Sequence, residues 1–429
     1  MKVVEYSSEG YDAFLQNLDR RAVPSQEVSE VVSGIISDVR ERGDAALREL
    51  TKKFDGADLS GGLLVTDEEW TAAEAVTSEA TREAIDASLR NITFFAEKSQ
   101  RQDWSARNEQ GAEVGERFVP FERVGCYVPG GKAPLVSTAL MTAGFAKAAG
   151  VPEIVAATPC GPDGSVNAEL LYALKAAGVT EAIKVGGAQG VAALALGTDS
   201  IAPVQKVVGP GNSFVVEAKR QLIGAISIDL LPGPSEIMVL ADASAKASFV
   251  AADLLGQAEH GPDSVVGLVT PSRALLDEVL TEIEKQAATL SRGEYLQQVL
   301  AQGAFAVVVE DLTQGIAVVN AFAPEHLSLV VEDEEQWLPQ VLTASAIYVG
   351  SFSPVAVGDF LAGPSHTLPT GGSGKSFSGL RADQFQRRVS VVRLDADAVT
   401  QSVEAVEEFA RIEGLDAHGR SARIRVSED

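Results

Sequence analysis

Residues 235–270 read SEIMVLADASAKASFVAADLLGQAEHGPDSVVGLVT and contain a complete strand–helix–strand unit. The runs at 237–240 and 265–269 are short, apolar and partly β-branched, which is typical of buried strands. The alanine- and leucine-rich segment between them ends near Glu259 and has the length of a helix. Parallel strands need a crossover of this kind, so the stretch predicts a parallel sheet covered by helices.

The same alternation continues on both sides of this unit and divides into two blocks that meet near Ser235. We therefore predict an α/β protein with two doubly wound parallel sheets. The further predicted strands lie at residues 154–157, 182–185, 206–208, 225–230, 306–309 and 327–331. The helices between them are predicted at residues 137–149, 168–177 and 213–222, and in segments that end near residues 290 and 321.

The two ends of the chain have a different character. Residues 1–23 predict a short strand or arm and a small helix, and a 3.6-residue period predicts helix over 25–54. A long helical stretch is predicted over 66–99, where Thr66 and Glu69 have the spacing of a capping box. Residues 101–120 are polar around Gly111 and predict a hairpin. A further amphipathic helix is expected at 400–412, before a short C-terminal tail.

Composition excludes several classes of function. The 429 residues carry a net charge of −25, which repels phosphate backbones and anionic membranes, so we expect no nucleic-acid or membrane partner. No apolar run is long enough to span a bilayer, and the N-terminus has no apolar core of a signal peptide. Cys126 and Cys160 have no metal-type spacing, which favours a reducing, cytoplasmic setting.

Three familiar sequence motifs are incomplete or absent. Residues 369–376, PTGGSGKS, nearly match a phosphate-binding P-loop, but Pro369 replaces the first glycine and no strand precedes it. A Gly/Ser loop beside an active site is the better interpretation. No G-x-G-x-x-G follows a strand, and the G-x-S-x-G of serine hydrolases is absent.

The chain has only four histidines, and each lies beside turn-forming or acidic residues. Gln257 and His260 share one face near a helix end, and Asp359 and His366 lie in a Gly/Pro/Ser-rich loop. Nitrogen and oxygen ligands of this mix suit zinc or a related divalent metal. Each position alone also fits a structural role, such as a histidine at a helix C-terminus or a loop residue that caps a turn.

Two further histidines complete the candidate site. His326 follows Glu325 at the entry of a strand, where both side chains could point into a cleft, and its intrinsic pKa suits a general base. His418 lies near the C-terminus, after Glu413. A polar loop pair and a solvent-exposed terminal histidine are the structural alternatives.

Glycine-rich turns after putative strands offer backbone N–H groups to a ligand. They lie at 126–131, 184–190 and 207–212, all in the first α/β block, whereas the histidines lie in the second block and the tail. This separation indicates one domain for a cofactor and another for metal and substrate.

Taken together, these motifs resemble the histidinol dehydrogenase family over nearly the whole chain. The resemblance rests on RVGCYVPGG, GGAQGVAALALGT, VVGPGN, GPSEIMVLAD, GQAEHGPDS, FAPEHLSLV, AGPSHTLPTGG and EGLDAH, in this order. It implies two Rossmann-like domains, one inserted in the other, with an N-terminal helical segment and a C-terminal helical extension that is swapped in a homodimer. The implied bounds are an arm at 1–23, a metal-binding catalytic domain at 24–128 and 237–380, an inserted NAD-binding domain at 129–236, and the extension at 381–429.

The resemblance also implies roles for individual residues. Zinc would be held by Gln257, His260, Asp359 and, from the other subunit, His418; all four would also contact the substrate. Glu325 and His326 match the catalytic pair, and His326 also faces the substrate. The remaining implied positions are Ser235, His366 and Glu413 for substrate, and Tyr127, Gln189 and Asn212 for NAD. The implied reaction is the zinc-dependent four-electron oxidation of L-histidinol to L-histidine through histidinal, with two NAD reduced.

Some positions depart from the family pattern, chiefly in the cofactor half. They include KAPLVST after the PGG turn, LLP before GPSE, and Ser213 and Phe214 after GPGN. Two alternatives therefore stay open at this point. One is a related zinc- and NAD-dependent dehydrogenase of another alcohol, such as a sulfonated diol, and the other is a non-enzymatic metal-binding relative.

Overall fold

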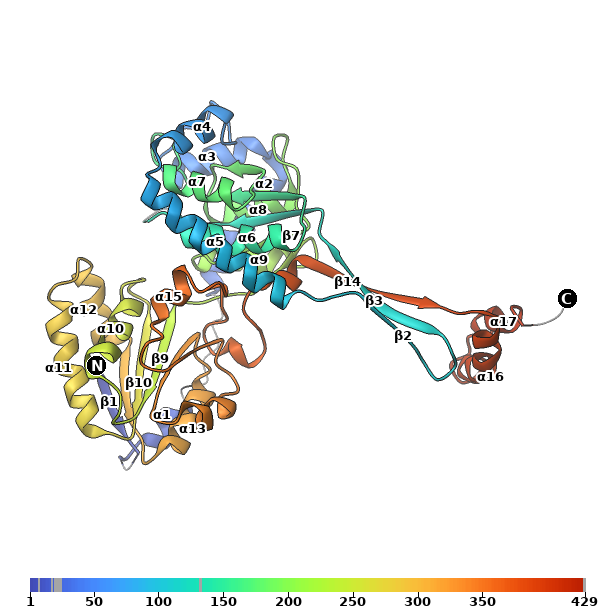
Figure 1. Ribbon diagram of the computed structural model, residues 1–429. Helices are drawn as coiled ribbons and strands as arrows, with labels where there is room; N and C mark the ends of the chain where they lie inside the picture. Colours follow the sequence, from blue (N-terminus) through green and yellow to red (C-terminus); the bar gives the residue numbers. More distant parts are fainter. Residues whose placement is uncertain (7, 17, 19–24, 131–132, 427–429) are drawn as a thin grey trace.

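The computed structural model describes residues 1–6, 8–16, 18, 25–130 and 133–426. It consists of two α/β lobes and a long arm that projects away from them (Figure 1). Each lobe is built on a parallel β-sheet, as the strand–helix alternation predicts. Among the described residues, no helix is both long enough and apolar enough to cross a membrane.

The first lobe has a five-stranded parallel sheet in the order β6-β5-β4-β7-β8. This is the 3-2-1-4-5 order of a Rossmann-type sheet, with its switch point between β4 and β7. Its strands are β4 (Arg123–Tyr127), β5 (Glu153–Ala157), β6 (Glu181–Ile183), β7 (Lys206–Val208) and β8 (Ser227–Ile228). The helices that follow them are α6 (Val136–Ala148), α7 (Ala168–Ala176), α8 (Gly187–Leu196) and α9 (Ser213–Leu222).

Four N-terminal helices pack on the same lobe, where α2 contacts α8 and α9, α4 contacts α7, and α5 contacts α6. They are α2 (Gln26–Arg42), α3 (Asp44–Phe54), α4 (Asp67–Val76) and α5 (Glu79–Ser99). The single helices expected over 25–54 and 66–99 are each broken once. Gly43 has φ +52°, which ends α2, and Ser78 caps α5 two residues after α4 ends. The capping box predicted for Thr66 and Glu69 is confirmed.

The second lobe has a six-stranded parallel sheet in the order β1-β11-β10-β9-β12-β13. Apart from β1 at the edge, it repeats the 3-2-1-4-5 order of the first lobe. Its strands are β1 (Lys2–Glu5), β9 (Glu236–Ala241), β10 (Val265–Thr270), β11 (Ala304–Val308), β12 (His326–Val330) and β13 (Ala346–Val349). Its helices are α1 (Tyr11–Gln16), α10 (Ala247–Ala258), α11 (Arg273–Ala287), α12 (Gly293–Gln302), α13 (Leu312–Phe322), α14 (Glu334–Trp337) and α15 (Val355–Phe360).

The two lobes have different boundaries from the domains expected from the sequence. The first lobe is inserted between β1 and β9 of the second, so insertion of one domain in the other is observed. However, Val32 and Ile92 share one core with Val124 and Leu194, so the expected boundary at residue 128 falls inside the first lobe. Strand β1 belongs to the second lobe rather than to a separate arm. Amphipathic periodicity shows which face of a helix is buried, but not which sheet covers it.

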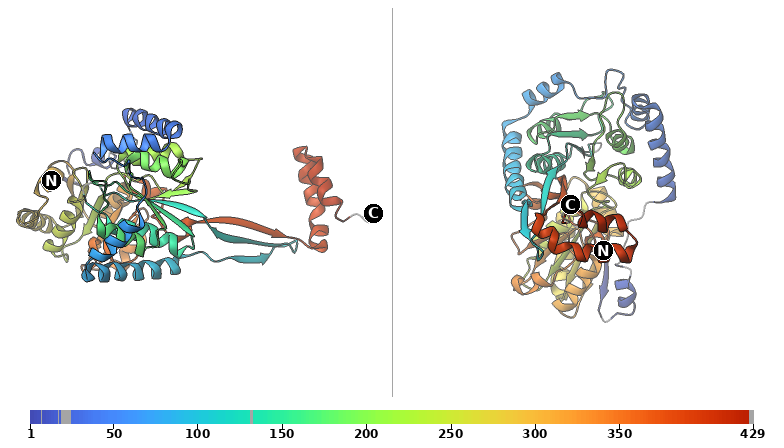
Figure 2. Two further views of the ribbon diagram at one scale, coloured as in Figure 1. Left: turned by 90° about the horizontal axis from the view of Figure 1, so that it is seen from above. Right: turned by 90° about the vertical axis from the view of Figure 1, so that its right-hand side faces the viewer.

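The arm is a three-stranded antiparallel ribbon that carries a pair of helices at its tip (Figures 1 and 2). The predicted hairpin is confirmed as β2 (Trp104–Arg107) and β3 (Glu113–Pro120), with Gly111 in the turn, and β14 (Gln386–Arg393) pairs with β3. The tip is formed by α16 (Ala396–Glu413) and α17 (Asp416–Arg423). Val392, Phe409 and Ile412 are each more than 60% exposed, so the described chain leaves apolar side chains of the arm uncovered.

Glu217 in α9 supports an acid-stability prediction. Its buried carboxylate accepts hydrogen bonds from Arg220 (2.6 Å) and Gln221 (2.7 Å), and these partners lower its pKa from 4.5 to about 2. A lowered folded-state pKa contributes stability above pH 4.5 that is lost as the pH falls toward 2. We expect Glu217→Gln to cost on the order of 2 kcal/mol in denaturant unfolding at pH 6 and much less near pH 2, where the folded-state carboxylate becomes protonated. A difference that does not change with pH would contradict this assignment.

Candidate active site

The candidate site lies between the lobes, at the amino ends of two adjacent strands of the second sheet. Glu325 directly precedes β12, and His326 is its first residue. In the neighbouring strand β9, Ile237 pairs with His326, and Glu236 lies just before it. The chain reaches Glu325 through Ala323, the only described non-glycine residue with positive φ (+53°), which ends α13 and redirects the backbone.

The backbone of Glu236 holds both residues of this pair. Its N–H donates to Glu325 Oε2 (2.8 Å), and its carbonyl oxygen lies 3.0 Å from His326 Nδ1. A carbonyl can only accept, so Nδ1 carries the proton and Nε2 of a neutral imidazole is left as a free acceptor. Burial lowers the pKa of His326 to about 3 and raises that of Glu325, which keeps the imidazole neutral. The arrangement presents a pre-oriented base.

Asp359 of α15 lies next to this base. Its Oδ1 is 3.6 Å from His326 Nε2, and its Oδ2 is 3.8 Å from His260 Nε2. Burial raises the pKa of Asp359 to about 7. Gln257 is buried near the end of α10, one turn before His260. The structure thus brings three of the four predicted metal ligands to one end of α10.

Several polar atoms here are buried without a hydrogen-bond partner. They include both side-chain atoms of the Gln257 amide, Oδ1 of Asp359 and Nε2 of His326. Buried polar groups are almost always satisfied, so a cluster of orphaned atoms indicates a ligand that satisfies them. Within the described residues, no three His, Cys, Asp or Glu side chains lie close enough together to hold a metal ion.

His366 connects the site to the first lobe. Its Nδ1 lies 3.1 Å from the Asp359 carbonyl oxygen, and its Nε2 lies 2.9 Å from Thr138 Oγ1 in α6. The preceding Ser365 donates to the carbonyl of Met141, also in α6 (3.3 Å). Burial lowers the pKa of His366 to about 4, which favours a neutral ring. His366 therefore fastens the Asp359 segment to the helix that follows β4.

Tyr348 is a neighbour that the sequence motifs do not reveal. Its ring centroid lies 6.0 Å from that of His326, and its pKa is raised by burial and by the Asp359 and Glu325 carboxylates. A Cβ at Gly358 would lie 2.2 Å from the Tyr348 hydroxyl oxygen, so only glycine lets the phenol pack beside Asp359. The sequence motifs also do not reveal Thr138, which contacts His366. The glycine before Asp359 was the available signal for Tyr348, whereas nothing local marks Thr138.

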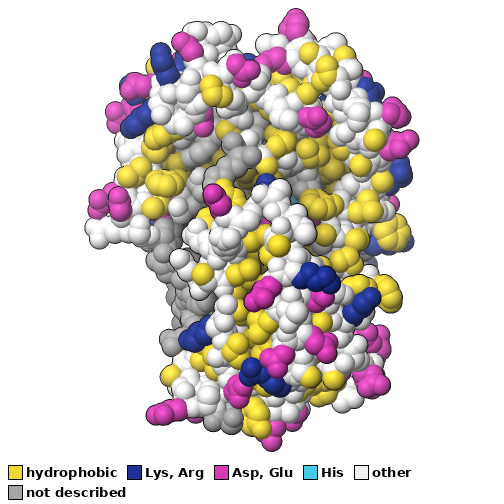
Figure 3. All heavy atoms as spheres, turned by 90° about the vertical axis from the view of Figure 1, so that its left-hand side faces the viewer, with side chains coloured by type: hydrophobic (Ala, Val, Ile, Leu, Met, Phe, Trp, Pro, Cys, Tyr) yellow, Lys and Arg dark blue, Asp and Glu magenta, His cyan; other side chains and the backbone are white. Residues whose placement is uncertain are grey.

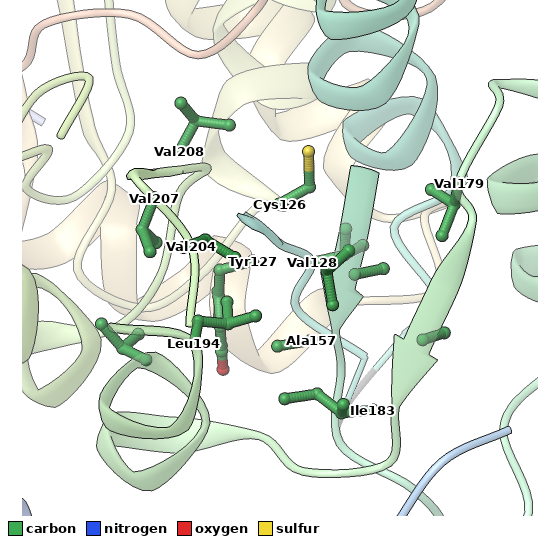
Figure 4. Close-up of a cluster of buried hydrophobic side chains, with 14 of the residues drawn as sticks. Cys126, Tyr127, Val128, Ala157, Val179, Ile183, Leu194, Val204, Val207 and Val208 are labelled. Carbon is green, nitrogen blue, oxygen red and sulfur yellow. The ribbon is translucent and has the colours of Figure 1, made fainter. Parts of the chain in front are cut away.

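The three predicted NAD positions lie at the carboxyl edge of the first sheet. Tyr127 ends β4 and is buried in the core (Figure 4), where its hydroxyl oxygen accepts from Gly187 N–H (3.0 Å). Gln189 is buried in the first turn of α8. Asn212 is exposed and caps α9, accepting from the N–H groups of Phe214 and Val215.

Three other predicted positions have different surroundings. Ser235 is half-buried just before β9, and its carbonyl accepts from Val265 N–H (3.0 Å). Glu413 and His418 are exposed on the two helices at the tip of the arm, away from both lobes (Figure 2). Within one chain, the structure does not bring these two residues to the others.

Two Rossmann-type lobes, with a buried carboxylate–imidazole pair between them, place the protein in the class of α/β dehydrogenases. The histidinol dehydrogenase family profile matches residues 18–426. Curated histidinol dehydrogenases from Xanthomonas euvesicatoria (41% identical; 99% of this chain, 99% of the relative) and Geobacillus kaustophilus (42%; 95% and 96%) are similar over nearly their whole lengths. The chain belongs to the histidinol dehydrogenase family.

One solved structure agrees with this assignment, and a second shares only the fold. The crystal structure of histidinol dehydrogenase from Elizabethkingia anophelis superposes with a TM-score of 0.95 at 33% identity, over 99% of this chain and 98% of that one. An acetylating aldehyde dehydrogenase from Geobacillus thermoglucosidasius has a TM-score of 0.50 at 14% identity, over 89% and 94%, which shows a likeness of fold alone.

Proposed function

We propose that this protein oxidises L-histidinol to L-histidine through histidinal and reduces two NAD in turn. In the balanced reaction, one alcohol, one water and two NAD⁺ give one carboxylate, two NADH and three protons. The observation that carries the proposal is the His326–Glu325 pair on the Glu236 backbone, which lies beside the orphaned polar atoms of Gln257 and Asp359. Family membership supplies the substrate class.

His326 is proposed as the general base of the first oxidation. Its free Nε2 can accept the alcohol proton as hydride leaves the adjacent carbon. Glu325 is proposed to activate the water that attacks the aldehyde. Burial raises the pKa of Glu325 well above its usual value, while the Glu236 N–H orients the carboxylate and favours its charged form. The enclosed position of both residues keeps the aldehyde away from bulk water between the two steps.

Gln257, His260 and Asp359 would hold a zinc ion, with His418 of the partner subunit as the fourth ligand. The donor set fits, because the two Gln257 amide atoms and one Asp359 oxygen are buried without partners. When bound, zinc would orient the imidazole and amine of the substrate. Ser235, His366 and Glu413 of the partner subunit would complete the substrate contacts.

NAD is proposed to bind the first lobe at the switch point between β4 and β7, where it would accept hydride. Tyr127, Gln189 and Asn212 surround the carboxyl ends of those strands and of β6, the usual ligand position in such sheets. The equivalent edge of the second sheet carries Asp242 and Glu332, where Asp242 accepts from Glu332 N–H (2.9 Å). Adjacent acids disfavour a pyrophosphate, so the first lobe is the better cofactor site.

The surface and the cysteines support two further parts of the proposal. On the face shown in Figure 3, Lys and Arg side chains of the described residues are scattered among acidic and apolar ones, which gives no support to a nucleic-acid partner.

Cys126 and Cys160 are free and buried, which favours a reducing, cytoplasmic location.

The stoichiometry of NADH formation tests the proposed reaction. Purified protein is incubated with limiting L-histidinol and excess NAD, and absorbance at the NADH band is followed to completion. Two NADH per histidinol are expected, and a chelator that strips the metal should abolish turnover. Metal-loaded protein that forms no NADH from histidinol, but forms it from another alcohol, would replace the proposal with the related dehydrogenase.

The proposed homodimer predicts complementation between two inactive variants. His418→Ala removes a residue given to the partner, whereas His326→Ala removes one kept in the chain's own lobe. If the site is shared, a mixed dimer contains one site with both residues intact, so random mixing of co-expressed subunits should restore about a quarter of the wild-type activity. Each variant expressed alone serves as the control. Mixed dimers as inactive as the parents would show that His418 serves its own chain.

A further inference from the structure

Lys219 and Asp229 form an ion pair whose two side chains have no solvent exposure. Lys219 lies in α9, and Asp229 directly follows β8. Two charges withdrawn from water are costly unless every remaining polar atom finds a partner. The proposed chemistry uses neither residue, so the pair needs another explanation.

The remaining bonds of the pair converge on one backbone unit, that of Gly209. Lys219 Nζ donates to the Gly209 carbonyl oxygen (2.9 Å), and Asp229 Oδ2 accepts from the Gly209 N–H (2.7 Å). Gly209 directly follows β7, whose Val207 pairs with Ile228 of β8. One ion pair therefore ties together the end of β7, the end of β8 and helix α9.

Gly209 also has a conformation that needs restraint. Its φ is +115°, a region that other residues rarely adopt, and a Cβ there would lie 2.1 Å from the Tyr127 carbonyl oxygen. The turn is thus pressed against the end of β4 on one side and held by the ion pair on the other. It leads through Pro210 and Gly211 to Asn212, which caps α9. Lys219 lies two helical turns after Asn212, on the same face of α9.

We propose that Lys219 and Asp229 are positioning residues that fix the 209–212 turn for dinucleotide binding. The turn crosses the switch point between β4 and β7, where a cofactor meets backbone N–H groups and the start of α9. The pair never touches the cofactor; it holds the backbone that does. This inference rests on the proposed NAD site and adds the two residues that shape it.

The test compares Lys219→Met with Lys219→Met/Asp229→Leu in the full-length protein. NAD affinity is measured by titration calorimetry, KM for NAD and for histidinol by steady-state kinetics, and Tm by calorimetry. The single variant leaves a buried carboxylate unpaired, so both Tm and NAD affinity should fall, the latter about ten-fold. The double variant removes both charges, so Tm should recover while NAD affinity stays about ten-fold weak and KM for histidinol stays near the wild-type value.

Glu217→Gln is the matched control, since Glu217 is a buried acid on the same helix that does not contact Gly209. It should leave NAD affinity unchanged. NAD affinity that recovers together with Tm in the double variant would overturn the inference and leave a purely structural ion pair. If Asn212→Ala weakens NAD binding but Lys219→Met does not, the inference fails while the cofactor site stands. Wild-type protein that binds no NAD would refute the proposed site itself.

Discussion

Replacing His326 by alanine is expected to lower kcat by about a thousand-fold, the usual contribution of a positioned general base. The expectation follows from the local geometry. The Glu236 carbonyl fixes the proton on Nδ1, Nε2 is left without a partner, and burial lowers the pKa of the ring to about 3. The ring therefore stays unprotonated near neutral pH, and Nε2 is free to accept the alcohol proton. Steady-state rates with saturating histidinol and NAD measure the effect.

A second substitution separates loss of the base from loss of structure. His326→Asn keeps an N–H that can donate to the Glu236 carbonyl, so its Tm should stay closer to the wild-type value than that of His326→Ala. Its kcat should nevertheless fall as far, because an amide is no base near neutral pH. An asparagine variant that kept most of the wild-type kcat would rule out His326 as the base and move that role to Glu325.

Replacing Asp359 by asparagine is expected to weaken zinc binding by at least about a hundred-fold, since the loss of an outer-sphere partner alone costs ten- to a hundred-fold. The metal-free protein should gain stability at pH 8, because burial raises the pKa of Asp359 to about 7 and its ionised form is disfavoured there. Zinc should then raise Tm far less than in the wild type. Metal content after dialysis and Tm with and without zinc provide readouts that do not depend on activity.

Asp253→Asn is the control for that experiment. Asp253 lies one turn before Gln257 in α10, its pKa is raised by burial to about 6, and its Oδ2 is 3.5 Å from Ser328 Oγ. It resembles Asp359 as a buried carboxylate but is not a proposed ligand, so zinc binding should persist. Equal loss of zinc from both variants would mean that general electrostatics, rather than ligation by Asp359, holds the metal.

Much of the fold could be predicted because its signals are local. Short apolar runs separated by alanine-rich helices indicated both sheets, and the hairpin at 101–120 was evident from its polar sequence around Gly111. The positions where a helical segment is interrupted were harder to predict. Gly43 divides the 25–54 segment because its φ is positive. A single glycine in an otherwise periodic segment is not enough to predict a positive φ.

For the site, sequence motifs drew attention to Glu325, His326 and Asp359, and the structure places these three together. Their assigned roles stay predictions. The sequence did not indicate that the backbone of Glu236 would orient Glu325 and His326, or that Tyr348 would pack against Gly358. Those contacts join residues that are far apart in the chain.

The sequence alone determined the alternation that produces two parallel sheets and the residue types that suit metal and proton chemistry, because hydrophobic period and side-chain chemistry are properties of short segments. Only the tertiary structure decided that α2 to α5 join the first lobe and that β1 joins the second. It alone placed His418 at the end of an arm and buried the Gln257 amide without partners. These outcomes depend on which segments, far apart in the sequence, pack against one another. Local sequence patterns do not predict that packing.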